Sequence, residues 1–283
     1  MALVLGFTVA AGCSSSARNT PQPTTTSSAA ANPTANPTTS APPASSTTSP
    51  ASAPVALYLL RGNYLGVARR TVGPVSTIGT AAVNALLGGP DASERAAGLS
   101  SAVPPGSKLL GLAVSSGTAT AHFDAAFGTP GPAPSELQRV AEVVYTLTQF
   151  PTVQLVSFSV DGNGLTAVDL SRPLGRSDLR AALPAILVEN PAVGDALAGT
   201  LRLAGMANVF EAQFRAQLTD ASGHVLVDQP VHATAGTGTW GSFDATFSLH
   251  VTTPTACLLR VYAVSAKDGS PIDEVDLHLT AKP

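Results

Sequence analysis

The alternation of apolar and polar positions changes character near Leu183, which divides the chain into two differently patterned regions. Before that point, runs with a two-residue period are mixed with two stretches whose apolar residues recur every three or four positions. We expect strands at 55–60, 64–72, 109–114, 119–123, 153–160 and 165–170, and helices at 77–87 and 135–149. This order predicts an α+β domain in which one sheet carries two helices on one face.

After Leu183 the pattern consists of short alternating runs without an amphipathic helix. The clearest run begins at Phe243, from which apolar residues occupy every second position as far as Val251. We expect strands near 185–189, 199–204, 209–218, 224–234, 241–251, 257–265 and 273–280. Seven short strands within about 100 residues predict an all-β, immunoglobulin-like sandwich.

The segment 14–54 differs in composition from both regions. It consists almost entirely of Ser, Thr, Pro, Ala and Asn, its one charged residue is Arg18, and it lacks Leu, Ile, Val and aromatic residues. Such a segment cannot bury enough apolar surface to offset the entropy lost on ordering. We therefore predict a disordered tether over residues 13–54, followed by folded domains at 55–183 and 184–283.

The first residues combine a short apolar run with a cysteine. Residues 2–11 are too few to span a bilayer and have the character of a secretory signal. The sequence Ala10-Ala11-Gly12-Cys13 resembles the lipobox of bacterial lipoproteins. The resemblance implies a signal peptide over 1–12, a diacylglycerol on the Cys13 thiol, and anchoring at the extracytoplasmic face of the cell membrane. The alternative is a free or buried cysteine near the N-terminus.

Composition and motifs argue against several classes of function. The 18 acidic and 15 basic residues give a net charge of −3, whereas nucleic-acid-binding proteins have a basic excess. Two cysteines are too few for a disulfide framework or a four-thiolate zinc site. The sequence lacks His-Glu-x-x-His and Gly-x-Ser-x-Gly, and Gly236-x-Gly238-x-x-Gly241 lies between two expected strands, where it predicts a loop. We therefore predict no metal, no cofactor and no enzyme, the alternative being an enzyme with dispersed catalytic residues.

Two features are candidates for a binding surface. Arg172, Arg176 and Arg180 recur at every fourth position beside the domain boundary, where they could contact an anionic wall polymer, the second domain, or only solvent. The second domain is acidic, because residues 184–283 hold 5 basic and 10 acidic residues, whereas 55–183 hold 9 and 8. Trp240, the single tryptophan, is expected either to pack in the core or to stack against a sugar.

Several short motifs resemble those of two bacterial families. The motifs at 85–90, 98–101, 103–106, 120–123 and 146–150 are similar to the GerMN domain of sporulation and spore-germination proteins. Those at 189–191, 205–207, 210–212 and 240–243 are similar to the germination-associated immunoglobulin-like (Gmad) domain. The first resemblance implies a fold akin to the ring-building motifs of secretion and sporulation complexes. It also implies an adaptor module without known catalytic residues.

Together these features predict a non-enzymatic, lipid-anchored adaptor or scaffold that binds an envelope protein and acts on a membrane sensor or a cell-wall complex. The tether would set its reach, and the two domains would present the binding surfaces. The alternative is a lipoprotein that binds peptidoglycan or another polysaccharide through Trp240 and the three arginines. No nucleic-acid partner is expected.

Overall fold

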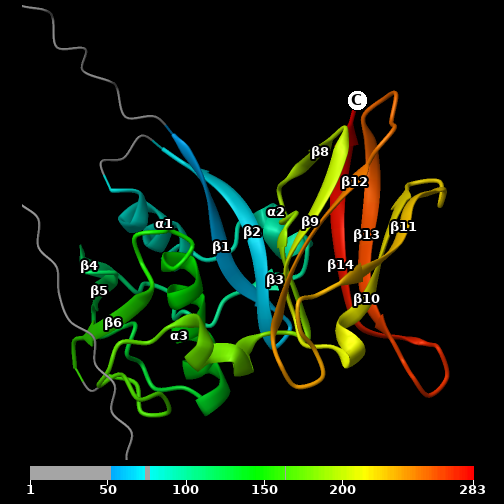
Figure 1. Ribbon diagram of the computed structural model, residues 1–283. Coiled ribbons are helices and arrows are strands. Elements are labelled where there is room, and N and C mark those ends of the chain that lie inside the picture. Colours follow the sequence, from blue (N-terminus) through cyan, green and yellow to red (C-terminus); the bar gives the residue numbers. More distant parts are fainter. Residues whose placement is uncertain (1–51, 74–76, 163) are drawn as a thin grey trace, which may run out of the picture. The chain divides into compact units, whose positions relative to one another are not determined.

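The structure, a computed structural model, describes residues 52–73, 77–162 and 164–283 (Figure 1). The predicted signal peptide, Cys13 and all but the end of the predicted tether lie outside these residues, so they remain predictions. In the described part of the chain, no helix is both long and apolar enough to cross a membrane.

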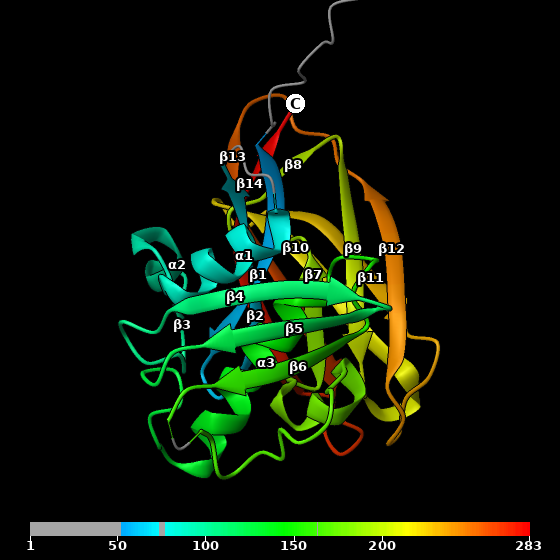
Figure 2. The same ribbon diagram turned by 90° about the vertical axis from the view of Figure 1, so that its left-hand side faces the viewer.

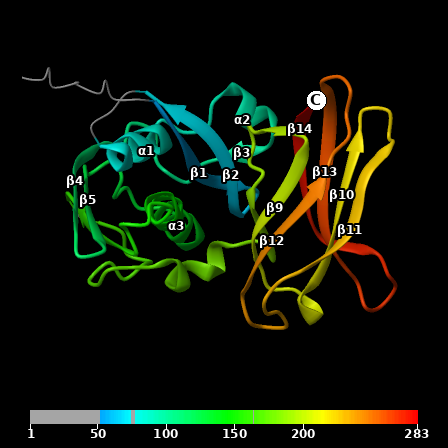
Figure 3. The ribbon, with the colours of Figure 1, turned by 45° about the horizontal axis from the view of Figure 1, so that its top comes forward.

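The first region has three layers, with helices between two small sheets. Its elements are β1 (Ala53–Arg61), β2 (Tyr64–Val72), α1 (Ile78–Leu87), α2 (Ala92–Ala96), β3 (Leu99–Ser100), β4 (Leu109–Ser115), β5 (Thr118–Phe123), α3 (Ala133–Leu147) and β6 (Leu155–Val160). The sheets have the orders β2-β1-β3 and β4-β5-β6. Because α1 contacts β1, β2 and β4, and α3 contacts β1 and β6, the helices are covered on both sides (Figures 1 and 3). The predicted α+β class is confirmed.

The expectation of one sheet is wrong, because both edges of β1 are already occupied. β2 pairs along the whole of β1 on one side, and β3 pairs with Leu60 and Arg61 on the other. The β4–β5 hairpin instead forms its own sheet with β6, and these three strands lie side by side in Figure 2. The buried side chains of Ala119, Ala121 and Phe123 line the inner face of this second sheet.

α3 is buried on its apolar side and also along a polar stripe. Its buried polar residues are Glu136, Arg139, Glu142 and Thr146. They bind backbone groups of neighbouring segments: Glu142 accepts from the Ala102 N–H (2.7 Å), Thr146 accepts from the Tyr58 N–H (3.2 Å), and Arg139 donates to the carbonyls of Ala102, Phe127 and Thr129. Each buried polar group thus has a partner, as low-dielectric surroundings require.

The strand expected at 165–170 is not formed, and the polar stripe of α3 explains why. The Glu136 carboxylate accepts hydrogen bonds from the N–H groups of Thr166 (2.9 Å) and Ala167 (2.8 Å). A carboxylate that takes successive backbone donors holds the chain in a loop and removes those donors from any sheet ladder. Residues 165–170 are accordingly an irregular segment that is hydrogen-bonded to α3.

The second region is the predicted immunoglobulin-like sandwich. Its strands are β7 (Ile186–Asn190), β8 (Ala196–Ala198), β9 (Thr200–Ala207), β10 (Gln213–Asp220), β11 (Val225–His232), β12 (Gly241–Ser248), β13 (Thr255–Val264) and β14 (Pro271–Lys282). The strand order is β11-β10-β13-β14-β8-β9-β12, and β7 also pairs with β9. Phe214 of β10 meets Phe243 of β12 edge to face, with ring centres 4.9 Å apart, so distant parts of this order pack face to face. Seven strands were expected, and β8 is the additional one.

Candidate functional site at the domain junction

A charged cluster joins the two regions where the second one begins. Arg176 is the first residue of the 3-10 helix η1 (Arg176–Ala182), and its Nη1 lies 2.7 Å from Oε1 of Glu189 on β7. Its Nη2 donates to the Tyr58 hydroxyl at 2.9 Å, and its Nε donates to Thr148 Oγ1 at 2.8 Å. The Tyr58 hydroxyl in turn donates to Glu189. We call Tyr58, Tyr145, Arg176 and Glu189 the junction clasp.

The clasp places a cation between two aromatic rings. The guanidinium carbon of Arg176 lies 5.1 Å from the ring centre of Tyr58 and 4.7 Å from that of Tyr145. Burial raises the pKa of both phenols, that of Tyr145 to about 12, so both remain protonated at neutral pH. A planar guanidinium stacks on rings while pairing with a carboxylate, a combination that an ammonium group does not offer. Arg176 is therefore bound by side chains of the protein itself.

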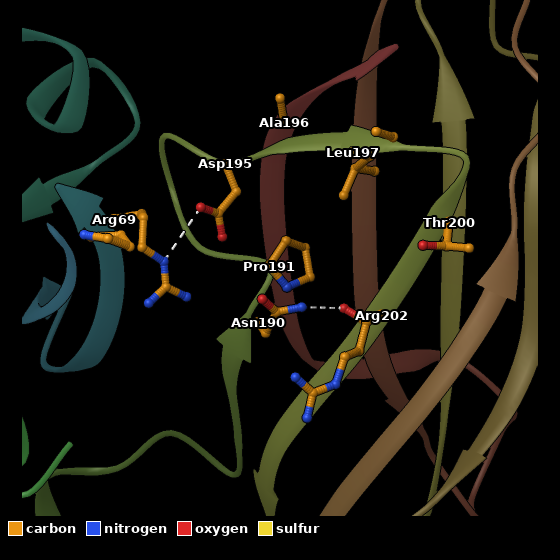
Figure 4. Close-up of a pocket in the computed structure, with 10 residues that line it drawn as sticks. Arg69, Asn190, Pro191, Asp195, Ala196, Leu197, Thr200 and Arg202 are labelled. Carbon is orange, nitrogen blue, oxygen red and sulfur yellow. Dashed lines mark hydrogen bonds and ion pairs between the residues drawn. The ribbon is translucent and has the colours of Figure 1, made fainter. Parts of the chain in front are cut away.

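A groove of about 530 Å³ adjoins the clasp at the segment Asn190-Pro191 (Figure 4). Arg69 of β2 enters it from the first region, with Nε 3.4 Å from Oδ1 of Asp195. Asn190 donates to the carbonyl of Arg202 at 2.6 Å, and the Arg202 guanidinium pairs with Asp244 at 2.6 and 2.9 Å. Both arginines thus already have carboxylate partners, so the groove presents paired charges and backbone to a ligand.

The arginines predicted as one stripe do not share a face. Arg172 lies on the surface before η1 and pairs with Asp178 of the same segment, with Nη2 2.9 Å from Oδ1. Arg180 is exposed, whereas Arg176 turns inward and contacts the second domain through Glu189. Of the three alternatives, contact with the acidic domain thus applies to Arg176, whereas Arg172 and Arg180 face solvent.

Trp240 is half-buried and packs against the hydrophobic core. It lies just before β12, in the loop that the sequence placed at Gly236-x-Gly238-x-x-Gly241. This placement favours the packing interpretation of Trp240 over the sugar-stacking one.

Sequence reasoning missed Tyr58, Glu189 and Arg69. Tyr58 lies within an apolar run and was assigned only to a strand, while Glu189 was part of a motif without an assigned role. One signal was available, because Arg69 and Arg70 are adjacent charges in an otherwise apolar strand, and charges in such positions need partners. Arg70 has one in Glu94 of α2, with Nε 2.8 Å from Oε1.

The buried ionisable groups are directed at the protein itself. Burial raises the pKa of Glu142 to about 8, although Ser101 and Ala102 donate hydrogen bonds to its oxygens. Backbone N–H donors, chiefly that of Ala167, lower the pKa of Glu136. Burial raises the pKa of the Cys257 thiol, which keeps it protonated and a weak nucleophile. Among the described residues, no group of three or more His, Cys, Asp or Glu side chains is placed to hold a metal ion.

Both regions match known domain families. Residues 56–166 match the family described as sporulation and spore germination. Residues 185–270 match the immunoglobulin-like domain of bacterial spore germination. None of the curated proteins matches the chain significantly.

Three solved structures are similar to parts of the chain. A predicted lipoprotein from Clostridium perfringens is 21% identical, with 45% of this chain and 90% of that chain covered and a TM-score of 0.33. The first GerMN domain of the sporulation protein GerM from Bacillus subtilis is 24% identical, with 44% and 99% covered and a TM-score of 0.37. The tandem GerMN domains of the same protein are 16% identical, with 82% and 62% covered and a TM-score of 0.39.

Proposed function

Because the chain contains a sporulation and spore-germination (GerMN) domain followed by a germination-associated immunoglobulin-like domain, we propose that it is a non-enzymatic adaptor outside the cytoplasm. Cys13 would carry a lipid anchor, and the segment 14–54 would set the reach of the folded part. The two domains would present their surfaces to a protein of the cell envelope, in a membrane sensor or a cell-wall complex.

The observation that carries this proposal is that the buried and partly buried charged groups bind other groups of the protein. Arg176 and Glu189 neutralise each other in the clasp, and Glu142 holds a loop backbone. In the described part of the chain, these groups serve the architecture, whereas a catalytic site directs such groups into a cavity. A junction fixed in this way also favours binding, because a partner then meets surfaces that are already ordered.

Crosslinking in living cells followed by mass spectrometry tests the proposal. We expect the natural chain to capture one envelope protein, and Cys13→Ala to lose most of that capture. Cys257→Ala is the matched control, since Cys257 is buried in the second domain and its loss leaves the anchor in place. Capture that is the same with and without Cys13 would contradict the anchored adaptor.

The wall-polymer alternative now rests on Arg172 and Arg180, because Trp240 packs against the core. Sedimentation with purified peptidoglycan separates the two functions. The adaptor proposal expects the protein to remain in the supernatant. Co-sedimentation that is lost in Arg172→Gln/Arg180→Gln would favour the polymer instead.

A further inference from the structure

β4 forms an open edge of the second sheet (Figure 2). The outer edge of β6 is closed by Leu174, which exchanges backbone hydrogen bonds of 2.8 and 2.9 Å with Val156. The outer edge of β2 is closed by Val193, which bonds the backbone of Val67 and Arg69 at 3.0 and 2.7 Å. Among the described residues, β4 pairs with β5 alone.

β4 has few of the features that protect edge strands. Such strands usually carry charges, prolines or bulges, which prevent pairing with other chains. The sequence of β4, Leu-Leu-Gly-Leu-Ala-Val-Ser, has no charge and no proline, and five of its seven residues are exposed. Its register shift lies between Leu109 and Gly111, at the start of the strand. The regular stretch 111–115 is therefore open to pairing.

The hairpin turn determines which backbone groups face the open edge. Ser116 and Gly117 have φ values of 49° and 81°, as in a two-residue type I′ turn, which makes Ser115 part of a hydrogen-bonded pair. Hydrogen-bonded and non-bonded pairs alternate along an antiparallel ladder. Leu112 and Val114 consequently direct their N–H and C=O groups away from β5, where an added strand would meet them.

An apolar cavity of about 480 Å³ lies beside the same stretch. Leu112 and Val114 line it together with Ile78, Leu147 and Phe150, and its lining contains no charged residue. Val114 is 49% exposed, so the cavity is accessible from the strand edge. In an added strand, the side chain opposite Leu112 or Val114 would lie on the same face and enter this cavity.

The chemistry of the surface specifies its occupant. The tether does not supply it, because residues 14–51 contain no Leu, Ile, Val or aromatic side chain. A charged segment is disfavoured, since neither the strand nor the cavity offers a counter-charge. We propose that β4 binds an extended, uncharged segment of a partner protein by strand addition, with one bulky apolar side chain in the cavity. This inference rests on the proposed adaptor function and names the surface that holds the partner.

Amide hydrogen exchange with a defined peptide tests the proposal. The protein is the full chain carrying Cys13→Ala, and the probe is the peptide Thr-Val-Thr-Leu-Thr-Val-Thr. We expect the amides of Leu112 and Val114 to exchange at least about tenfold more slowly when the peptide is present, because they become hydrogen-bonded. The same peptide with Asp in place of Leu should give no protection. Exchange at both amides that is unchanged by the Leu peptide at millimolar concentration overturns the proposal.

Two matched variants locate the effect. Val114→Asp places a charge at the cavity rim and should weaken peptide binding at least about tenfold. Val225→Asp makes the same change at a residue of β11 that is 45% exposed, and should leave binding unaltered. Equal binding by both variants, or protection of β4 that depends only on protein concentration and so reports pairing of two copies, also overturns the proposal. The hydrogen-exchange test uses protein in which β4 is unchanged, so its result does not depend on whether Val114→Asp folds.

The two proposals fail separately. If the peptide does not bind but crosslinking still captures one envelope protein, only the assignment of β4 is lost. If the peptide protects β4 but the cells yield no partner, the site remains and the adaptor function is lost.

Discussion

Arg176 and Glu189, 13 residues apart in the chain, form an ion pair across the boundary between the two domains. Their side chains are 27% and 26% exposed, so water screens the pair only in part. The same guanidinium is enclosed by two tyrosine rings. At this boundary Arg176 thus makes an ion pair with Glu189, hydrogen bonds to Tyr58 and Thr148, and two ring contacts.

Arg176→Met should lower the free energy of unfolding by about 1–3 kcal/mol, because Glu189 loses its cation and Tyr58 loses a donor. Urea titration measures the change. Arg202→Met is the matched control, since the Arg202–Asp244 pair is 59% and 56% exposed and should contribute less than about 1 kcal/mol. Equal losses in the two variants would show that the clasp has no special role.

The single tryptophan allows the two domains to be followed separately during unfolding. Trp240 fluorescence reports the second domain, whereas helical circular dichroism reports the first, which contains α1, α2 and α3. Because the clasp and the Val193 backbone bonds join the domains, we expect both signals to change at the same urea concentration. Two separate midpoints would show that the junction does not couple them.

Glu142 should make stability decline as pH rises from about 5 to about 8. Burial raises its pKa to about 8 in the folded protein, whereas a glutamate in an unfolded chain titrates near about 4.3. The folded state therefore binds more protons in this range, so its stabilisation is complete below the unfolded pKa and is lost as pH rises through the folded pKa.

Glu142→Gln removes this dependence, since the amide can accept from Ala102 and donate to Ser101 without titrating. Relative to the natural chain, the variant should gain on the order of 1–3 kcal/mol in the free energy of unfolding between pH values of about 5 and 8. Urea titrations at several pH values give the two curves. Parallel curves would refute the assignment. Glu136→Gln is the control, because the pKa of Glu136 is lowered and its stabilisation is lost only as pH falls through that lowered pKa, so this variant should leave the slope between pH values of about 5 and 8 unchanged.

Gly236→Ala should destabilise the second domain by about 3 kcal/mol or more. A Cβ on Gly236 would lie 2.4 Å from the carbonyl oxygen of Val209 and 2.5 Å from the nitrogen of Ala212, and both are backbone atoms that cannot turn aside. Gly73→Ala is the control, because among the residues that the structure describes no atom lies within 4 Å of a Cβ at that position. A thermal unfolding temperature that falls equally in both variants would contradict this account of the glycine-rich loop.

The sequence predicted most strands because their alternation is a local property. Phe243 and its neighbours in β12 show this directly, since every second side chain faces inward. The stripe of Glu136, Arg139 and Glu142 could not be predicted in this way, because charged residues at helical spacing usually face water, and here they face loops that are distant in the sequence. The start of α3 was also misplaced, because the helix was expected from residue 135 and begins at Ala133.

The residues of the candidate site were likewise predicted only in part. The arginine spacing identified Arg176, but a helical stripe presupposes a regular helix, whereas η1 is a short 3-10 helix with a non-helical residue at Leu179. The partners Tyr58 and Glu189 lie 118 and 13 residues away from Arg176, and only the tertiary fold brings them together.

The position of β1 has a mechanical consequence. It begins at Ala53, where the predicted tether ends, and it pairs at nine positions with β2 and at two with β3. A pull on the N-terminal end of the folded part would act first on β1. Displacing β1 would require breaking its pairing with strands on both sides, whereas a strand at the edge of a sheet is held by one neighbour only. In an anchored protein under tension, the first folded element to bear the load would therefore be a strand that is held along both of its edges.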